Sequence, residues 1–162
     1  MAVLAGCLVG VVLSAPVLSD HKEDHDYDRH AGYYYPPPQT RETYKAQAIT
    51  LPDSDRKRRL GFVTAMTASM VAGNYPPPFA IFAKGDDAEK LIIVSVRAGA
   101  YDTIYRGRAL LAMLTAIART TPIFSEFGVE DVFTFFDLAK LLGFQKITIS
   151  DGDKYAHQIF IE

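Results

Sequence analysis

The chain has 162 residues, which fits one ordinary domain with a short extension and is too few for two full domains. Hydrophobic residues make up 49% and charged residues 22%, close to the averages of folded domains, and this excludes a wholly disordered chain. The formal net charge of −2 gives no overall field that would attract DNA, RNA or an anionic membrane, so we expect no nucleic-acid partner.

Residues 1–19 carry no charged side chain and contain an apolar run from Ala2 to Leu13. The run is shorter than the roughly 20 residues that span a bilayer, and small residues follow it, as in a cleavable secretory signal. We therefore predict a signal peptide over 1–19, an exported protein (periplasmic or extracellular), and no transmembrane segment in the mature chain. Cleavage after Ser19 would leave no cysteine, and hence no disulfide and no thiol nucleophile.

Two alternatives stay open for this segment. Cys7 follows Leu4-Ala5-Gly6 and could be acylated, as in a lipoprotein. No Lys or Arg precedes the apolar run, so the start site could also be assigned too late.

The tetrapeptide Val3-Leu4-Ala5-Gly6 resembles the opening of the molybdopterin-guanine dinucleotide biosynthesis protein A family, in which a strand runs into a Leu-Ala-Gly-Gly loop that binds GTP phosphates. The whole chain is also similar to small exported bacterial proteins of unknown function that sometimes receive that label. The resemblance implies a nucleotidyltransferase that binds GTP and magnesium through these residues of an uncleaved chain. Cys7 stands where the family has its second Gly.

Residues 20–30, here called the acidic tract, read DHKEDHDYDRH and hold five acids, two bases and three of the four histidines. Because so polar a run has little apolar surface to bury, it cannot offset the entropy lost on ordering. We therefore predict a disordered linker over 20–42. His21, His25 and His30 could gather around a divalent cation, and zinc or copper suits imidazole. The favoured alternative is a solvated acidic tail without a metal.

Two segments combine tyrosine with three consecutive prolines: Tyr33 to Pro38, and Tyr75 to Pro78. Consecutive prolines favour an extended polyproline II conformation. The exposed rings could dock on a protein partner, as could a sheet edge, or the tyrosines could pack over the domain's own core. We favour packing on the domain itself.

Residues 43–162 are predicted to form a single α+β domain with a small, mostly antiparallel sheet of about five strands and three helices, in the order β-α-β-β-α-α-β-β. Alternation of apolar and polar residues predicts a strand over 43–51, and runs of β-forming residues predict strands over 79–83 and 91–96. Two further strands, over 146–150 and 155–161, flank a turn in a hairpin pattern. Helical spacing predicts helices that end near residue 72, over 103–119 and over 129–142. Acid- and glycine-containing turns between strands predict two antiparallel hairpins.

The predicted helices have recognisable starts and inner faces. Asp53 or Ser54 can cap the first helix, and Asp102 the second. The expected inner faces are Leu60, Val63, Met66, Thr67 and Met70 in the first helix, Leu110, Leu111, Leu114 and Ile117 in the second, and Phe133, Phe136, Leu138, Leu141 and Leu142 in the third. The basic run from Arg56 to Arg59 could bind an anion, but a solvated patch, which could face the acidic tract, is favoured.

No phosphate loop, nucleophile elbow or zinc-protease motif occurs in the sequence. A Ser-His-Asp arrangement would depend on His157, which alternates with Tyr155 and Ile159 and is more typical of a hydrogen-bonded interior residue. Asp102 and Asp137 could meet as an acid pair. We therefore assign no catalytic or cofactor-binding residue and consider an enzyme the less favoured class.

Three functions stay open. The first is an exported, non-enzymatic binding or accessory module of unknown ligand, and it is preferred because it requires no motif that the chain lacks. The second is divalent-metal handling through the acidic tract. The third is the nucleotide transfer that the family resemblance implies.

Overall fold

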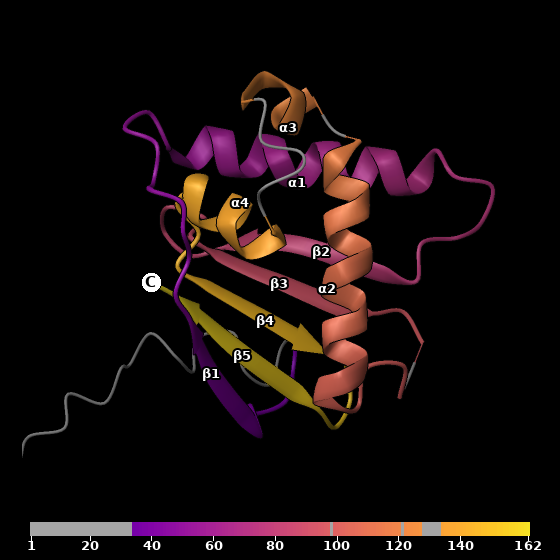
Figure 1. The fold of residues 1–162 in the computed structure, drawn as a ribbon. Coiled ribbons are helices and arrows are strands. Elements are labelled where there is room, and N and C mark those ends of the chain that lie inside the picture. The colour runs from indigo at the N-terminus through magenta and orange to yellow at the C-terminus, as the bar shows by residue number, and fades with distance from the viewer. Residues whose placement is uncertain (1–33, 98, 121, 128–133) are drawn as a thin grey trace, which may run out of the picture.

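A computed structural model describes residues 34–97, 99–120, 122–127 and 134–162 of the chain. Its elements, drawn in Figure 1, are β1 (Thr40–Tyr44), α1 (Arg56–Val71), β2 (Phe79–Lys84), β3 (Lys90–Ser95), α2 (Ile104–Arg119), α3 (Pro122–Phe127), α4 (Phe135–Leu141), β4 (Lys146–Ser150) and β5 (Ala156–Ile161). The predicted signal peptide, with Cys7, and the acidic tract lie outside the described residues. Among the described helices, none combines the length and the apolar character needed to cross a membrane.

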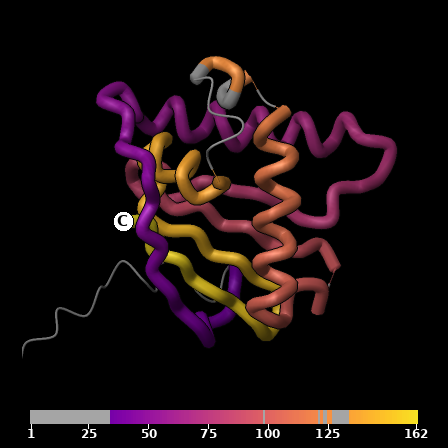
Figure 2. The backbone as a smooth tube through the Cα atoms, in the orientation of Figure 1, coloured from indigo at the N-terminus to yellow at the C-terminus, as the bar shows by residue number. Residues whose placement is uncertain are grey.

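The five strands form one sheet in the order β1-β5-β4-β3-β2. The predicted hairpins are confirmed as the antiparallel pairs β2–β3 and β4–β5. The pairs β3–β4 and β1–β5 are parallel, and Figure 2 shows β1 in indigo beside β5 in yellow. The α+β class is therefore confirmed, but the expectation of a mostly antiparallel sheet is wrong, because the sheet is mixed. The chain passes from β3 to β4 through α2, α3 and α4, and so long a crossover allows parallel pairing where a hairpin turn does not.

The first strand lies earlier in the chain than predicted. β1 begins at Thr40 and ends at Tyr44, where the prediction placed a strand over 43–51. Beyond β1 the amide of Gln47 donates to Oδ1 of Asp137 on α4 at 2.7 Å. The backbone bonds of the ladder extend as far as the amide of Ala46, which donates to the carbonyl of Glu162. The alternation of apolar residues continues, but Gln47 is bonded to a helix and not to the sheet.

Three helices of seven residues or more, α1, α2 and α4, correspond to the three predicted, and the six-residue α3 adds a turn between α2 and α4. A continuous helix over 129–142 is wrong. Thr134 has extended backbone angles and caps α4 in a capping box with Asp137, so the helix starts after it. Residues 128–133, which include the predicted core residue Phe133, lie outside the described residues.

The core lies between the helices and one face of the sheet. The second helix buries its predicted residues Leu110, Leu111 and Leu114, whereas Ile117 is only partly buried. The α1 face is rotated from the prediction: Phe62 is completely buried together with Met66, while Leu60 and Val63 are half-buried and Thr67 is exposed. The facing strand residues are Ile81, Leu91, Ile93, Ile147, Ile149 and Ile159.

The rotation of α1 accompanies the burial of Arg59, which is 7% exposed and contradicts the idea of a uniformly solvated basic run. Its Nε donates to the carbonyl of Asp87 at 2.8 Å, and its Nη1 donates to the carbonyl of Leu142 at 3.2 Å and to Ser54 Oγ at 3.1 Å. One side chain thus joins α1 to the β2–β3 turn and to the end of α4. Gly143 follows with φ +79°, and a Cβ there would lie 2.5 Å from Ser54 Oγ and 2.6 Å from Arg59 Nη1.

The β4–β5 turn is organised by one carboxylate. Oδ1 of Asp151 accepts hydrogen bonds from the amides of Asp153, Lys154 and Tyr155 at 3.0, 2.9 and 2.8 Å. Burial by itself raises the pKa of Asp151, but these amides stabilise the charged form more, so the pKa lies below its ordinary value.

The sheet face turned away from the helices, here called the second face, has a smaller cluster of its own. Tyr35 is 4% exposed and packs with Ile92 and Ala156, and the ring of Tyr34 lies 5.7 Å from that of Phe82. The first tyrosine and proline segment therefore packs on its own domain, as predicted. The folded body accordingly includes residues from Tyr34 onward, earlier than the predicted boundary at residue 43.

Candidate functional site

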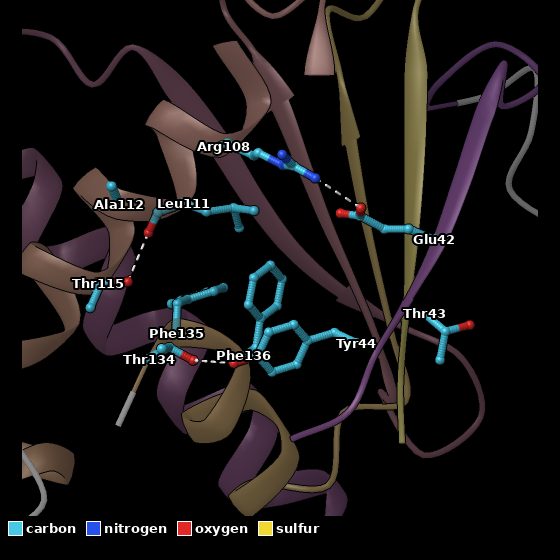
Figure 3. Close-up of a pocket in the computed structure, with 10 residues that line it drawn as sticks. All are labelled: Glu42, Thr43, Tyr44, Arg108, Leu111, Ala112, Thr115, Thr134, Phe135 and Phe136. Atoms are coloured by element: carbon cyan, nitrogen blue, oxygen red, sulfur yellow. Dashed lines mark hydrogen bonds and ion pairs between the residues drawn. The ribbon is translucent and has the colours of Figure 1, made fainter. Parts of the chain in front are cut away.

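A pocket of about 380 Å³ lies on the helix side of the sheet, between β1, α2 and α4. Figure 3 draws its lining, with an ion pair at one end and aromatic rings at the other. We call it the β1–α2–α4 pocket. Pockets that hold small organic molecules in proteins have volumes of about 300–1,000 Å³, are mostly apolar and carry a few placed polar groups.

The polar end of the pocket is made by two side chains from distant parts of the chain. Nη2 of Arg108 on α2 lies 3.4 Å from Oε2 of Glu42 on β1 (Figure 3). The other oxygen, Oε1, lies 3.1 Å from Nε2 of His157, whose Nδ1 lies 2.7 Å from Oγ1 of Thr40. His157 is 3% exposed and both its ring nitrogens have partners. It is therefore the hydrogen-bonded interior residue that was predicted, and it holds Glu42 at the edge of the pocket.

The wall of the pocket is apolar. The rings of Tyr44 on β1 and Phe136 on α4 are stacked, with centroids 4.3 Å apart and an interplanar angle of 28°. Leu111 and Phe135 are buried beside them. Thr115 donates its hydroxyl to the carbonyl of Leu111 at 2.9 Å, one turn back on α2, and so leaves its methyl group for the wall. An aromatic or branched aliphatic group of a bound molecule would contact carbon atoms on most sides.

The local sequence explains why this wall keeps its shape. The capping box of Thr134 and Asp137 fixes the start of α4, which places Phe135 and Phe136 immediately after the cap. Asp137 is 2% exposed and also accepts the amide of Gln47. The segment after β1 and the first turn of α4 are thus held by the same carboxylate, which keeps Tyr44 and Phe136 in register.

The ion pair at the polar end is weak enough to be exchanged. The side chains of Arg108 and Glu42 are 61% and 32% exposed, and so exposed a pair contributes at most about 1 kcal/mol. An anionic group on a ligand could replace Glu42 as the partner of Arg108 at small cost. The freed Glu42 would stay held by His157 and could accept a hydrogen bond from a donor on the same ligand.

A larger but open hollow of about 890 Å³ lies beside Arg56 at the start of α1, where an anion site was one of the alternatives. Asp55 caps the helix by accepting the amide of Arg58 at 2.7 Å, so the predicted caps Asp53 and Ser54 are wrong. Asp53 instead pairs with the guanidinium of Arg58 at 2.6 Å. In this stretch one carboxylate thus caps the helix and another neutralises one base of the run.

The metal and nucleotide candidates fall outside the described residues. These are His21, His25 and His30 for zinc or copper, and the tetrapeptide at residues 3–6 for GTP. Within the part of the chain that the structure describes, no group of three or more His, Cys, Asp or Glu side chains could hold a metal ion.

The two acids considered as a catalytic pair have separate roles. Asp102 pairs with Arg106 at 2.7 Å, next to Thr103, which caps α2 in place of the predicted Asp102. Asp137 is bound to Thr134 and to the Gln47 amide, as described above. Each carboxylate is occupied in local structure.

Some exposed features of the described residues could meet a protein partner. The second tyrosine and proline segment is exposed, with Tyr75 at 85% and Val71 nearby at 64%. Strands β1 and β2 are the two edges of the sheet. By contrast, Tyr35 is buried on the second face and offers no such surface.

Sequence reasoning missed Glu42, Arg108 and Phe136 as members of one site. Each is unremarkable alone: an acid just before a predicted strand, a base on a predicted helix and a residue of a predicted apolar face. One signal for the site was present in the sequence. Because side chains alternate along a strand, Glu42 lies on the same face of β1 as Tyr44, so one charge is placed on the face that turns toward the core. The chain matches no protein-family model, no curated protein and no solved structure.

Proposed function

We propose that the protein is a non-enzymatic binding module that takes a small amphipathic molecule into the β1–α2–α4 pocket. The observation that carries the proposal is the combination of an aromatic wall with an exchangeable Arg108–Glu42 pair at one end. The ligand has an aromatic or branched apolar body of a size suited to about 380 Å³ and an anionic or hydrogen-bonding group next to Arg108.

Two fluorescent probes test the two halves of the pocket. The probes 1-anilinonaphthalene-8-sulfonate and N-phenyl-1-naphthylamine share their ring system and differ in the sulfonate. We expect both to bind saturably, and we expect Ala112→Leu, which places a larger side chain in the lining, to weaken both at least tenfold. Ala116→Leu is the matched control, because it makes the same change one turn later on an exposed part of α2 that does not line the pocket.

The charged end is tested by Arg108→Gln. Loss of one exposed charge pair, worth at most about 1 kcal/mol, should weaken the sulfonate probe by up to about fivefold and leave the neutral probe almost unchanged. Arg106→Gln is the control, since Arg106 lies on the same helix and pairs with Asp102 outside the pocket. Equal binding of both probes to Ala112→Leu and to the unmodified protein would reject the pocket as the site.

We further propose that the module acts outside the cytoplasm, on the basis of the signal predicted over residues 1–19. The intact mass of the protein from its native host tests this, and a chain that starts at Asp20 without lipid would support export. A chain that starts at Met1 would reject export and would make GTP binding the next assay. Zinc or copper in the same sample, lost on deletion of residues 20–30, would support the metal alternative.

A further inference from the structure

The polar end of the β1–α2–α4 pocket presents two opposite charges side by side. Nη2 of Arg108 lies 3.4 Å from Oε2 of Glu42, and the two side chains reach the rim from α2 and β1 (Figure 3). Among the described residues that line the pocket, these two are the only charged ones. The charges at the rim therefore balance, one positive and one negative.

The negative charge of this pair is held in place from behind. A carboxylate oxygen only accepts hydrogen bonds, so Nε2 of His157 carries a hydrogen and donates to Oε1 of Glu42 at 3.1 Å. In the neutral ring Nδ1 then accepts the hydroxyl hydrogen of Thr40 at 2.7 Å. The hydroxyl of Tyr155 donates to Oγ1 of Thr40 at 3.1 Å. This chain of donors anchors one oxygen of Glu42, so the carboxylate stays at the rim when a ligand enters.

A fixed carboxylate beside Arg108 restricts the charge of the ligand. A ligand that carries only an anion would gain Arg108 but would meet the carboxylate of Glu42 a few ångströms away. A ligand that carries only a cation would meet the guanidinium in the same way. Like charges placed together across an interface reduce affinity and so select against such ligands. A ligand with one group of each sign, close together, pairs with both side chains.

The remainder of the lining selects an apolar group. The hydroxyl of Thr115 is bonded to a main-chain carbonyl, and that of Thr134 donates to Asp137 at 2.8 Å. The hydroxyl of Tyr44 lies 3.4 Å from Oγ1 of Thr134. Each of these wall hydroxyls thus has a partner within the protein, and Figure 3 shows the side chain of Thr43 turned away from the aromatic rings. A polar side chain of a ligand would lose its bonds to water and gain little in return.

Resting on the binding function proposed above, we propose that the ligand of the β1–α2–α4 pocket is a free α-amino acid with an aromatic or branched apolar side chain. Such a molecule carries its carboxylate and its ammonium group on one carbon atom, which suits two protein charges 3.4 Å apart. Its carboxylate pairs with Arg108 and its ammonium group with Glu42. Its side chain lies against Leu111 and the stacked rings of Tyr44 and Phe136.

Displacement of the neutral probe N-phenyl-1-naphthylamine from the full chain at low salt tests the class of ligand. The competitors are L-phenylalanine, 3-phenylpropionate, which lacks the ammonium group, and 2-phenylethylamine, which lacks the carboxylate. We expect phenylalanine to displace the probe at the lowest concentration. Each analogue should be about three- to fivefold weaker, which is the contribution of one exposed charge pair. Leucine should also displace the probe, and serine should not.

Two variants assign each charge to its partner. Glu42→Gln should make 3-phenylpropionate at least as effective as phenylalanine, and Arg108→Gln should do the same for 2-phenylethylamine. Arg106→Gln and Asp153→Asn are the matched controls, because neither residue lines the pocket, and both should keep the preference for phenylalanine. Binding of the neutral probe to each variant shows that its pocket is intact.

The outcomes separate this proposal from the binding function on which it depends. If 3-phenylpropionate or 2-phenylethylamine displaces the probe from the unmodified protein as well as phenylalanine does, the amino-acid class is overturned. The same holds if Glu42→Gln and Arg108→Gln leave the order of the competitors unchanged. In both cases weaker probe binding by Ala112→Leu would keep the pocket as an apolar binding site. Unchanged probe binding by Ala112→Leu would reject the pocket and the amino-acid ligand together.

Discussion

Replacement of Gly143 by alanine should destabilise the protein. Among the described glycines that lie in a helix or directly after one, we expect this position to be the most sensitive to alanine. Gly143 has φ +79°, where a non-glycine residue is disfavoured by about 1–2 kcal/mol. The new Cβ would also lie 2.5 Å from Ser54 Oγ and 2.6 Å from Arg59 Nη1. Arg59 must then move and give up its bond to the Leu142 carbonyl, and a hydrogen bond from a charged group is worth about 1.5–3 kcal/mol.

Together these effects give a loss of about 3 kcal/mol, after a gain of about 0.5 kcal/mol from the stiffer unfolded chain. For a chain of this length that corresponds to a fall in Tm of about 6–12 °C. Thermal melting and urea unfolding followed by circular dichroism measure it. Gly61→Ala is the control, because nothing lies within 4 Å of its added Cβ in the middle of α1, and it should stabilise by up to about 1 kcal/mol. A Tm for Gly143→Ala within 2 °C of the unmodified protein would refute this account of the Arg59 cluster.

Three further changes have clear expected outcomes. Gly107→Ala should stabilise the protein by up to about 1 kcal/mol and so raise its Tm, because the added Cβ would meet methyl groups of Ile149 at the ordinary contact distances of 3.9 and 4.0 Å. A lower Tm in a thermal melt would show that α2 cannot accept a methyl group there. Asp151→Asn should cost about 1–2 kcal/mol at pH 7, since charged acceptors bind amides more strongly than neutral ones. Folding lowers the pKa of Asp151, so the difference in unfolding free energy between the two proteins should persist down to the unfolded-state pKa of about 3.9. It should be lost as the pH falls further through the folded-state pKa, and urea unfolding at pH 7 and pH 2.5 measures this loss. Thr134→Ala should cost about 1 kcal/mol of stability by removing the capping box with Asp137, and an unchanged urea midpoint would contradict the cap.

The parts of the fold that local sequence determines were predictable. Both hairpins follow from turn residues between β-forming segments, and α2 follows from its three buried leucines. Residue pairs far apart in the chain determine the rest. The parallel pairing of β1 with β5 joins Thr40 to His157, and no local pattern near residue 40 indicates it. The inner face of α1 was misplaced because the prediction assumed that Arg59 is solvated, whereas Arg59 satisfies carbonyls in two other elements.

The pocket could not be predicted for the same reason. Arg108 and Glu42 are 66 residues apart, and only the packing of α2 against the sheet edge brings them together. What the sequence did indicate is that His157 would be an interior residue with hydrogen bonds. Its two partners, both on β1, could not be named before the register was known.

The parallel pairing of β1 with β5 has a consequence for the order of events during synthesis. Glu42 and Tyr44 are synthesised well before β5, the strand with which theirs pairs, since His157 of β5 comes 117 positions after Thr40. At about 5–20 residues per second, β1 must wait roughly 6–25 seconds for its neighbour. The β1–α2–α4 pocket is therefore complete only after β5 has been made, and a chain that lacks β5 should retain α1 and the β2–β3 hairpin but bind neither fluorescent probe.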